Sequence, residues 1–267
     1  MNKWHKSTLV IFGAVIFSTV AIQASDILRN IDGNLVGSAI ESGNVCGEGA
    51  EPITLGSGTL CVDLYEASAG TQCPVSILET SADTQQNMNV IECTTQSESE
   101  VLPWNFVSLT QAQQLCARSG KRLPSADEWY NLALAMGNQT TCVTNGSSPT
   151  LTGVSDCVTQ SGIHDMVGNV WEWIDADVSD GSYNNRTLPE SGFVHLVDSD
   201  GVVVQTGSVS MEEYGSDYAQ TSQEGVRGVV RGGYYGGGDD SGIHAQNLAV
   251  PLDLRTVGVG FRCVKSL

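Results

Sequence analysis

Positive charge is scarce in this 267-residue chain, in which 12 lysine and arginine residues stand against 30 aspartate and glutamate residues, for a formal net charge of −18. A surface of that sign repels the phosphates of nucleic acids and anionic lipid headgroups, so neither is expected as a partner. The surplus of carboxylates suits divalent cations instead. A membrane contact is considered only for the N-terminal segment.

Histidines and closely spaced cysteines are scarce as well. Beyond the first 24 residues the histidines are His164, His195 and His244, with no H-x-x-x-H spacing. Non-haem iron usually needs two or three histidines with a carboxylate, so an iron site has few candidates. None of the eight cysteines stands in a C-x-x-C pair, the spacing that zinc ribbons and thiol redox motifs need. Even-numbered, widely spaced cysteines are typical of disulfides, here four, in an oxidising compartment.

The N-terminus has the layout of a signal peptide. A short basic stretch precedes an uncharged apolar run from Ser7 to Ala24, which predicts a signal peptide over 1–24, cleaved after Ala24. The alternative is an uncleaved membrane anchor, because the run is near the lower length limit of a spanning helix. Residues 25–58, rich in Gly, Ser, Asn and acid, are predicted to be an exported lead-in segment. We therefore expect an extracytoplasmic protein, whether periplasmic, secreted or at the cell surface.

Residues 59–267 are predicted to form one α+β domain. Alternating apolar residues in TLCVDLYEAS, 59–68, predict its first strand, whereas the polar stretch 70–100 is predicted to be a loop stapled by cysteines. From residue 138 onward short strands alternate with long Gly-, Ser- and Asp-rich loops. In that part FVHLVDSDGVVVQ, 193–205, is typical of a hairpin. No internal repeat is present.

Two helices are predicted from their capping boxes. The first box runs from Ser108 to Gln111 and the second, SADE, begins at Ser125. In each, a serine side chain satisfies a backbone N–H of the first turn while the acid or amide three residues later reaches back. Gly120 and Gly137 mark the expected ends of the two helices.

Four motifs in order resemble one protein family. They are PWNFVSLTQAQQLCARSGKRLPSADEWYNLA, GIHDMVGNVWEWI, VVRGG and VGFRC. Together they resemble the formylglycine-generating-enzyme family, also called the sulfatase-modifying-factor domain, over about residues 59–265. The resemblance implies a variant of the C-type-lectin-like fold, with two main helices, short antiparallel strands and long loops. It says less about activity, because sites are grafted on folds.

The resemblance implies a calcium site in GIHDMVGNVWEWI. Matched position by position, the ligands are the side chains of Asp165 and Glu172 and the backbone carbonyls of Gly168 and Val170. Calcium takes several hard oxygens from a flexible loop, and a glycine lets the backbone turn its carbonyls inward. The alternative is a plain β-turn with solvated acids and tryptophans that fill the core.

One disulfide also follows from the resemblance. Some members join the helix cysteine to the cysteine of GFRC, which here implies a bond between Cys116 and Cys263. For the other six cysteines, proximity in the chain favours three pairs, although other pairings stay open at this level: Cys142 with Cys157, Cys73 with Cys93, and Cys46 with Cys61.

Formylglycine generation, the activity after which the family is named, is not expected. Formylglycine-generating members bind copper through a cysteine pair in the stretch after RGG, and soft thiolates are the ligands that Cu(I) requires. The matching stretch, 231–262, contains no cysteine. Other members resemble non-haem iron oxidoreductases, for which His244 is the one histidine near the expected cleft. An oxidoreductase therefore stays as the alternative function, with no catalytic residue named.

A binding role is favoured instead. Target proteins of diversity-generating retroelements share this fold and carry their variable positions after RGG. The composition of YYGGGDDSGIHAQN resembles theirs, since tyrosine supplies rigid contact area and small polar residues supply adaptable hydrogen bonds. A glycine-rich connecting loop without a ligand is the alternative. The predicted residues for a protein, peptide or small-molecule ligand are Tyr234, Tyr235, Asp239, Asp240, His244, Gln246 and Asn247.

Overall fold

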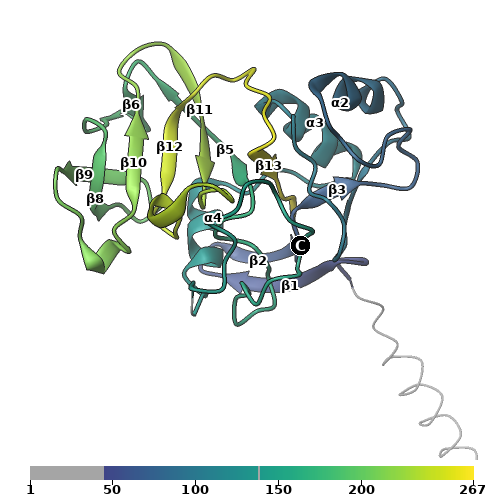
Figure 1. Ribbon diagram of the computed structural model, residues 1–267, viewed down its shortest axis with the longest axis horizontal. Helices are drawn as coiled ribbons and strands as arrows, with labels where there is room; N and C mark the ends of the chain where they lie inside the picture. The colour runs from purple at the N-terminus through teal and green to yellow at the C-terminus, as the bar shows by residue number, and fades with distance from the viewer. Residues whose placement is uncertain (1–44, 138) are drawn as a thin grey trace, which may run out of the picture. The chain divides into compact units, whose positions relative to one another are not determined.

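Short strands and three helices make up the described part of the chain, residues 45–137 and 139–267 of a computed structural model (Figure 1). Cys46–Leu267 forms one compact unit. The predicted signal peptide 1–24 and the lead-in segment up to residue 44 lie outside the described residues. Among the residues that are described, no helix has the length and apolar character to cross a bilayer.

The larger sheet has nine strands in the order β7-β6-β5-β11-β12-β10-β8-β9, with β13 paired to β5. Most neighbours are antiparallel, but β10 pairs with β12, and β13 with β5, in parallel. Its strands are β5 (Trp171–Ser179), β6 (Ser182–Tyr183), β7 (Arg186–Thr187), β8 (Gly192–Val197), β9 (Val203–Gly207), β10 (Tyr218–Thr221), β11 (Val226–Arg231), β12 (Gln246–Val250) and β13 (Val259–Phe261).

The smaller sheet joins the two ends of the compact unit. It has the order β1-β2-β14, with strands β1 (Ala50–Leu55), β2 (Gly58–Asp63) and β14 (Val264–Ser266). The ordered part thus begins before residue 59, and β1 occupies part of the predicted 25–58 lead-in segment. The polar composition of that segment concealed β1, because only one of its six residues is buried. A third sheet pairs β3 (Ala67–Ala69) with β4 (Thr95–Ser97).

Both predicted helices form, as α3 (Leu109–Arg118) and α4 (Ala126–Ala133). Ser108 accepts a hydrogen bond from the Gln111 backbone N–H, and the Gln111 side chain accepts one from the Ser108 N–H. In α4 the Glu128 carboxylate accepts from the Ser125 N–H at 2.9 Å. The capping boxes therefore start both helices as predicted.

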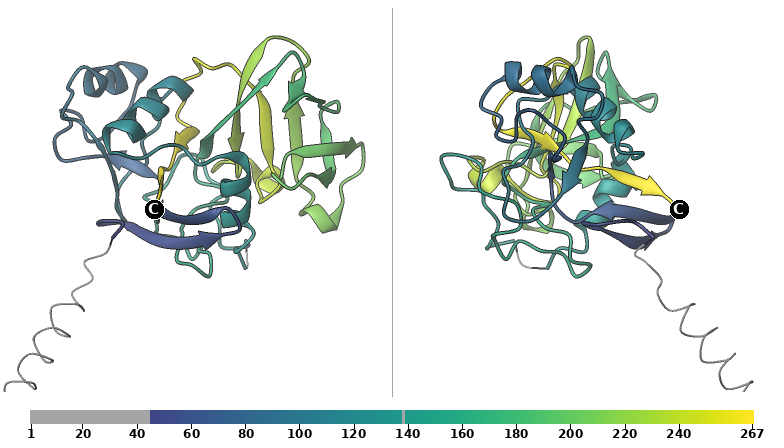
Figure 2. Two further views of the ribbon diagram at one scale, coloured as in Figure 1. Left: turned by 180° about the vertical axis from the view of Figure 1, so that it is seen from behind. Right: turned by 90° about the vertical axis from the view of Figure 1, so that its right-hand side faces the viewer.

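A third helix, α2 (Ser81–Met88), lies within the predicted loop 70–100. It too has a capping box, in which the Asp83 carboxylate accepts from the Thr80 N–H at 2.8 Å. Its buried side chains are the polar Thr84 and Asn87, so no apolar periodicity announces it. Figures 1 and 2 show α2 and α3 at one end of the unit and strands β8 to β10 at the other.

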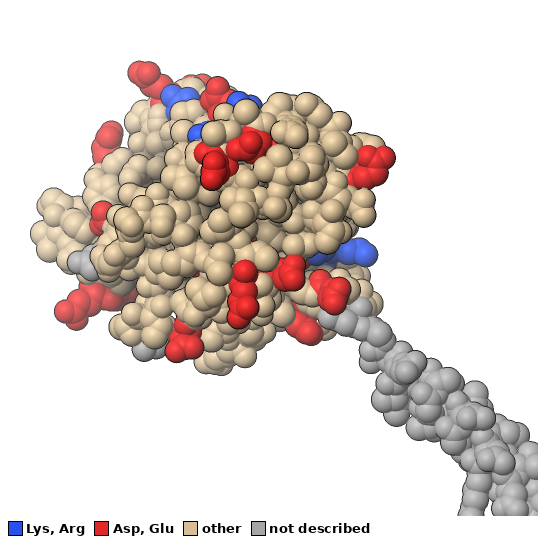
Figure 3. Space-filling view, turned by 45° about the vertical axis from the view of Figure 1, so that its right-hand side comes forward, with Lys and Arg blue, Asp and Glu red and all other residues tan. Residues whose placement is uncertain are grey.

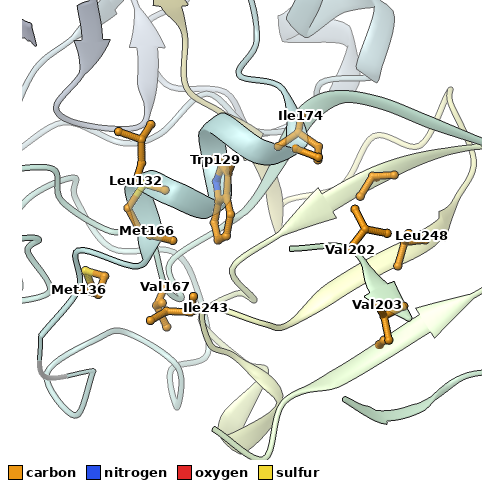
Figure 4. Packing of buried hydrophobic residues seen from close by; sticks show 14 of the residues in the cluster. Trp129, Leu132, Met136, Met166, Val167, Ile174, Val202, Val203, Ile243 and Leu248 are labelled. Atoms are coloured by element: carbon orange, nitrogen blue, oxygen red, sulfur yellow. The ribbon is translucent and has the colours of Figure 1, made fainter. Parts of the chain in front are cut away.

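Two hydrophobic clusters fill the interior. One surrounds Trp129 of α4, with Leu132 and Met166 beside it and Val203 and Leu248 of the large sheet further along (Figure 4). The other lies between α3 and the chain's C-terminal segment and includes Trp104, Trp173 and Phe261.

All eight cysteines are paired, and all four predicted pairs are present. Cys116–Cys263 spans 147 residues and ties α3 to the segment between β13 and β14. Cys142–Cys157 closes the loop that precedes the GIHDMVGNVWEWI segment.

Candidate functional site

The GIHDMVGNVWEWI segment is a turn that leads directly into β5. Asp165, Gly168 and Asn169 all have left-handed backbones, with φ of 57°, 78° and 52°. A Cβ on Gly168 would lie 2.3 Å from the Val143 carbonyl oxygen. Glycine is therefore required here both for the backbone angle and for the close approach of the neighbouring loop.

Asp165 is buried, with 2% of its surface exposed. Its Oδ2 accepts from the Gly153 N–H at 2.8 Å and its Oδ1 from the Ser155 hydroxyl at 3.0 Å. Burial raises the pKa of its carboxyl. The side chain thus fastens the turn to the 153–155 loop.

Glu172 forms a buried ion pair with Arg262 of the VGFRC motif. Both side chains are at most 1% exposed, and the Arg262 Nε lies 2.8 and 2.9 Å from the two carboxylate oxygens. The Trp129 indole N–H adds a hydrogen bond at 2.7 Å. Three of the four family motifs therefore meet at one carboxylate.

Glu66 is a third buried carboxyl group beside this pair, and sequence reasoning did not identify it. It accepts hydrogen bonds from the Asn169 side-chain amide at 2.5 Å and from the Val170 N–H at 3.2 Å. Burial, and then the charges of Asp165 and Glu172, raise its pKa well above the usual value. The signal for it was an acid in the otherwise alternating TLCVDLYEAS stretch.

The predicted calcium ligands all lie in or directly after this turn, but they differ in what they face. An ionised carboxylate has about four lone-pair sites, and Asp165 uses two of them for Gly153 and Ser155. Asp165 therefore has lone-pair sites left for a calcium ion, whereas both oxygens of Glu172 already accept hydrogen bonds from Arg262 and Trp129. Neither acid is solvated, unlike in the plain-turn alternative. Calcium binding by Asp165, Gly168, Val170 and Glu172 stays a prediction.

The loop after VVRGG folds back on itself and onto the 143–146 loop. The Ser241 hydroxyl lies 3.3 Å from the Tyr234 N and 3.2 Å from its carbonyl oxygen. Tyr235 donates its N–H to the Asn169 carbonyl, and Gly238 donates its N–H to the Thr144 carbonyl, each at 2.8 Å. The loop is thus fixed by backbone hydrogen bonds on both sides.

A cleft of about 540 Å³ lies beside this loop. Three segments build it: the loop stapled by Cys142, the segment between the 3₁₀ helix η1 (Glu212–Tyr214) and β10, and the 3₁₀ helix η2 (Gly238–Asp240) with the residue after it. The lining residues are mostly small and polar: Gln139, Thr140, Thr144, Asn145, Gly215, Ser216, Asp217, Gly238 and Ser241.

His244 lies behind the cleft among aromatic side chains. Its ring centroid is 5.7 Å from that of Tyr130 and 5.2 Å from that of Tyr214. Burial, and then the nearby charge of Arg231, lower its pKa to about 4. Asp217 accepts from the His244 backbone N–H at 2.7 Å, and burial raises the pKa of this carboxyl to about 6.

The predicted ligand residues do not share one surface. Tyr234 and Tyr235 are half-buried and Asp240 is exposed, whereas Gln246 is fully buried and bonds to the Val203 N–H and the Gly201 carbonyl. Asn247 bonds to Gln220 of β10, and nothing is described for the side chain of Asp239. None of the six predicted residues whose side chains are described lines the cleft, to which this loop contributes Gly238 and Ser241 instead.

The histidines lie in separate settings. His164 stacks on Tyr65 with ring centroids 4.9 Å apart, and the His195 Nε2 lies 2.8 Å from the Val209 carbonyl oxygen. Within the described residues, no group of three or more His, Cys, Asp or Glu side chains could hold a metal ion.

A family model described as "Sulfatase-modifying factor enzyme 1-like domain" matches residues 78–267. No curated protein sequence matches the chain significantly. Among solved structures, "Major Tropism Determinant U1 Variant" is similar at TM-score 0.48 and 14% identity, over 84% of this chain and 54% of that one. The chain thus spans about half the length of that relative.

Two other similar structures match over most of their own length. "Treponema denticola variable protein 1" has TM-score 0.44 and 14% identity over 82% of this chain and 99% of that one. "Structure of PvdO from Pseudomonas aeruginosa" has TM-score 0.45 and 14% identity over 85% and 88%.

Proposed function

Since the chain belongs to the sulfatase-modifying factor enzyme 1-like domain family, we propose that it is an exported member that binds a polar ligand, such as a peptide segment, in the cleft beside the loop after VVRGG. The predicted α+β, C-type-lectin-like fold class agrees with the family match. Activity is a separate matter, because related folds carry unrelated sites.

The cleft is the observation that carries the proposal. Its volume of about 540 Å³ lies within the usual range of about 300–1,000 Å³ for ligand sites, as do those of three other hollows, and what distinguishes it is that the loop after VVRGG forms one wall. Amides, hydroxyls and backbone line it rather than apolar side chains, which suits a ligand rich in hydrogen-bonding groups. The Cys142–Cys157 disulfide and the backbone bonds of Tyr235 and Gly238 hold its walls. Such preorganisation reduces the entropy lost on binding.

Copper or iron chemistry would need free cysteines or clustered histidines. The arrangement of these residues here supports binding over the oxidoreductase alternative. All eight cysteines are in disulfides, so none offers the thiolate that Cu(I) requires. His244 is surrounded by Tyr130, Tyr214 and Asp217, without a second histidine in that set.

Export is supported by the four disulfides, because such bonds persist in oxidising compartments. The predicted signal peptide lies outside the described residues. Release of a mature chain beginning at Ser25 into the periplasm or medium, detected by N-terminal sequencing, is the expected result.

A selection with a phage-displayed random peptide library tests the binding function. Asn145 lines the cleft and is exposed, whereas the exposed Ser147 of the same loop does not line it. Peptides selected on the unmodified protein should lose at least tenfold in affinity for Asn145→Trp, because the indole fills the cleft, and keep their affinity for Ser147→Trp.

Two outcomes would overturn this proposal. One is the recovery of no peptide that distinguishes the two tryptophan variants. The other is stoichiometric iron or copper in protein purified without chelators, together with oxygen uptake that His244→Ala abolishes.

Calcium stabilisation is part of the same proposal. We expect the melting temperature to be higher in Ca²⁺ than in chelator, because a bound ion stabilises the folded state by mass action. Asp165→Asn should abolish this difference, whereas Asp177→Asn, an exposed control on β5, should keep it. The measured quantity is the difference between the two conditions, since Asp165 also bonds Gly153 and Ser155. Equal melting temperatures of the unmodified protein in both conditions would exclude the site.

A further inference from the structure

Three aromatic rings lie in a row where β5 meets the loop after VVRGG. Trp171 of β5 stacks on Tyr234, with centroids 6.5 Å apart and planes at 22°. Tyr234 meets Tyr235 edge to face, with centroids 5.2 Å apart and planes at 74°. All three are half-buried. We call Trp171, Tyr234 and Tyr235 the aromatic row.

The core does not account for this arrangement. Trp171 packs against one hydrophobic cluster as a partly buried member, while Tyr234 and Tyr235 belong to neither cluster of the described residues. The backbones of Trp171 and Tyr235 are nevertheless fixed, because Trp171 donates its N–H to the Gly258 carbonyl and Tyr235 to that of Asn169. Half-buried rings on a fixed backbone offer area to a partner at little entropic cost.

Glycines border the central ring. An added Cβ would lie 3.1 Å from the Tyr234 ring at Gly236, 3.4 Å at Gly237 and 3.3 Å at Gly258. Any other residue at these positions would crowd the ring. The glycine backbones thus hold the Tyr234 ring in place from several sides.

The charges around the row are negative. Asp240 is exposed on η2, within the turn that Ser241 closes onto Tyr234. Of the arginines near these segments, Arg231 and Arg262 are fully buried, and Arg255 is turned toward Gln111 of α3 at 3.0 Å. On the one face of the molecule that Figure 3 presents, acidic side chains are more frequent than basic ones.

We propose that the aromatic row binds the guanidinium group of an arginine side chain in the peptide ligand, with Asp240 supplying the opposite charge. A guanidinium is planar and weakly hydrated, so it stacks on aromatic faces, whereas an ammonium is compact and strongly hydrated. This inference rests on the proposed function and names the chemistry that the site recognises.

The test uses three labelled peptides that differ at two positions, occupied by arginine, lysine or citrulline. Fluorescence anisotropy at physiological salt should show the arginine peptide binding about three- to tenfold more tightly than the lysine peptide, from the strength of cation–π contacts. The neutral citrulline peptide should bind most weakly. Nonspecific attraction to a chain of charge −18 would favour arginine and lysine equally.

Substitutions distinguish the contribution of the aromatic rings to binding from that of the Asp240 charge. Trp171→Leu and Tyr234→Leu keep the net charge and should reduce arginine binding to the lysine level, while Trp171→Phe should restore part of the preference. Phe193→Leu removes a half-buried ring of the Phe193–Tyr218 pair elsewhere and should change nothing. Asp240→Asn should weaken the arginine and lysine peptides alike.

The outcomes also distinguish this inference from the proposed function. Equal affinity for arginine and lysine peptides, or unchanged affinity in both ring variants, would overturn the inference. If library-selected peptides without arginine still lose affinity for Asn145→Trp, the binding function stands and the inference fails. If no selected peptide distinguishes Asn145→Trp from Ser147→Trp, both the binding function and the inference fail.

Discussion

At the scale of single residues, Glu172 has a partner that its turn motif does not reveal. Glu172 was predicted as a calcium ligand, and in the structure its carboxylate is the buried partner of Arg262. Such pairs need both members, because removal of one leaves a charge in a medium that solvates it poorly. The ion pair between Glu172 of GNVWEW and Arg262 of VGFRC thus joins β5 to the C-terminal segment of the chain.

Glu172→Gln should therefore destabilise the fold by about 3–5 kcal/mol, the usual cost of breaking a buried pair. Asp177→Asn, an exposed acid on the same strand, should stay within about 0.5 kcal/mol of the unmodified protein. Urea denaturation measures both. A loss below about 1 kcal/mol in Glu172→Gln would mean that Arg262 finds another anion.

Asp217 and His244 give opposing pH dependences. The folded pKa of Asp217 is raised to about 6, so its contribution to stability is complete below the unfolded value near 3.8 and is lost as pH rises to 6. The folded pKa of His244 is lowered to about 4, so its contribution grows as pH rises from 4 to its unfolded value near 6.5. The contributions of these two groups therefore nearly cancel between pH 4 and 6, while the raised pKa values of Glu66 and Asp165 act alike on variants of either residue.

His244→Gln should expose the Asp217 slope. Relative to the unmodified protein, its stability should fall by about 2–3 kcal/mol from pH 4 to 6, at about 1.4 kcal/mol per pKa unit. The stability of Asp217→Asn relative to the unmodified protein should change in the opposite direction and rise over the same range. Urea titrations at several pH values measure this, and slopes of the same sign in both variants would contradict the assignment.

At the scale of elements, the sequence predicted those helices and strands that a short local stretch specifies. The capping boxes at Ser108 and Ser125 start α3 and α4, and the 193–205 pattern forms the hairpin of β8 and β9. The helix α2 was missed because its capping box at Thr80 leads into polar residues. The strand β1 was missed because β2 beside it, not its own composition, orders it.

The candidate site was predictable only in part for the same reason. The loop after VVRGG was identified from its composition, but the residues of it that line the cleft, Gly238 and Ser241, were not among those predicted to bind. Gln246 looks like a loop amide in the sequence, yet register places it on β12 facing the interior. The role of Trp171 in the aromatic row depends on contact between distant segments, which no local pattern encodes.

The packing of α2 depends on one amide. Asn87 donates to the Val75 carbonyl at 2.8 Å and accepts from the Val75 N–H at 2.9 Å. Asn87→Ala should cost about 1 kcal/mol or more, because it removes the partner of two part-buried backbone groups of Val75. The exposed Asn89→Ala in the same turn serves as the control. Faster amide exchange confined to residues 74–93 should accompany the loss, and unchanged exchange there would contradict it.

At the scale of the whole molecule, the disulfides differ in the length of chain that they close. Cys116–Cys263 spans 147 residues and Cys142–Cys157 spans 15. In the chain-entropy account these correspond to about 5 and about 3 kcal/mol of stabilisation. Pairwise replacement by serine should therefore lower the urea midpoint more for Cys116/Cys263 than for Cys142/Cys157. The reverse order would show that native-state strain or residual unfolded structure dominates.

The pairing of β2 with β14 has a consequence for biosynthesis. Residues 58–63 leave the ribosome about 200 residues ahead of 264–266, which at about 5–20 residues per second is a delay of about 10–40 seconds. During that time the nascent chain has Cys116 without Cys263 and Glu172 without Arg262. Cys46 and Cys61 can join at once, but the unit as a whole closes only after translation of the VGFRC segment. The late arrival of that segment therefore keeps the unit incomplete until translation is nearly finished.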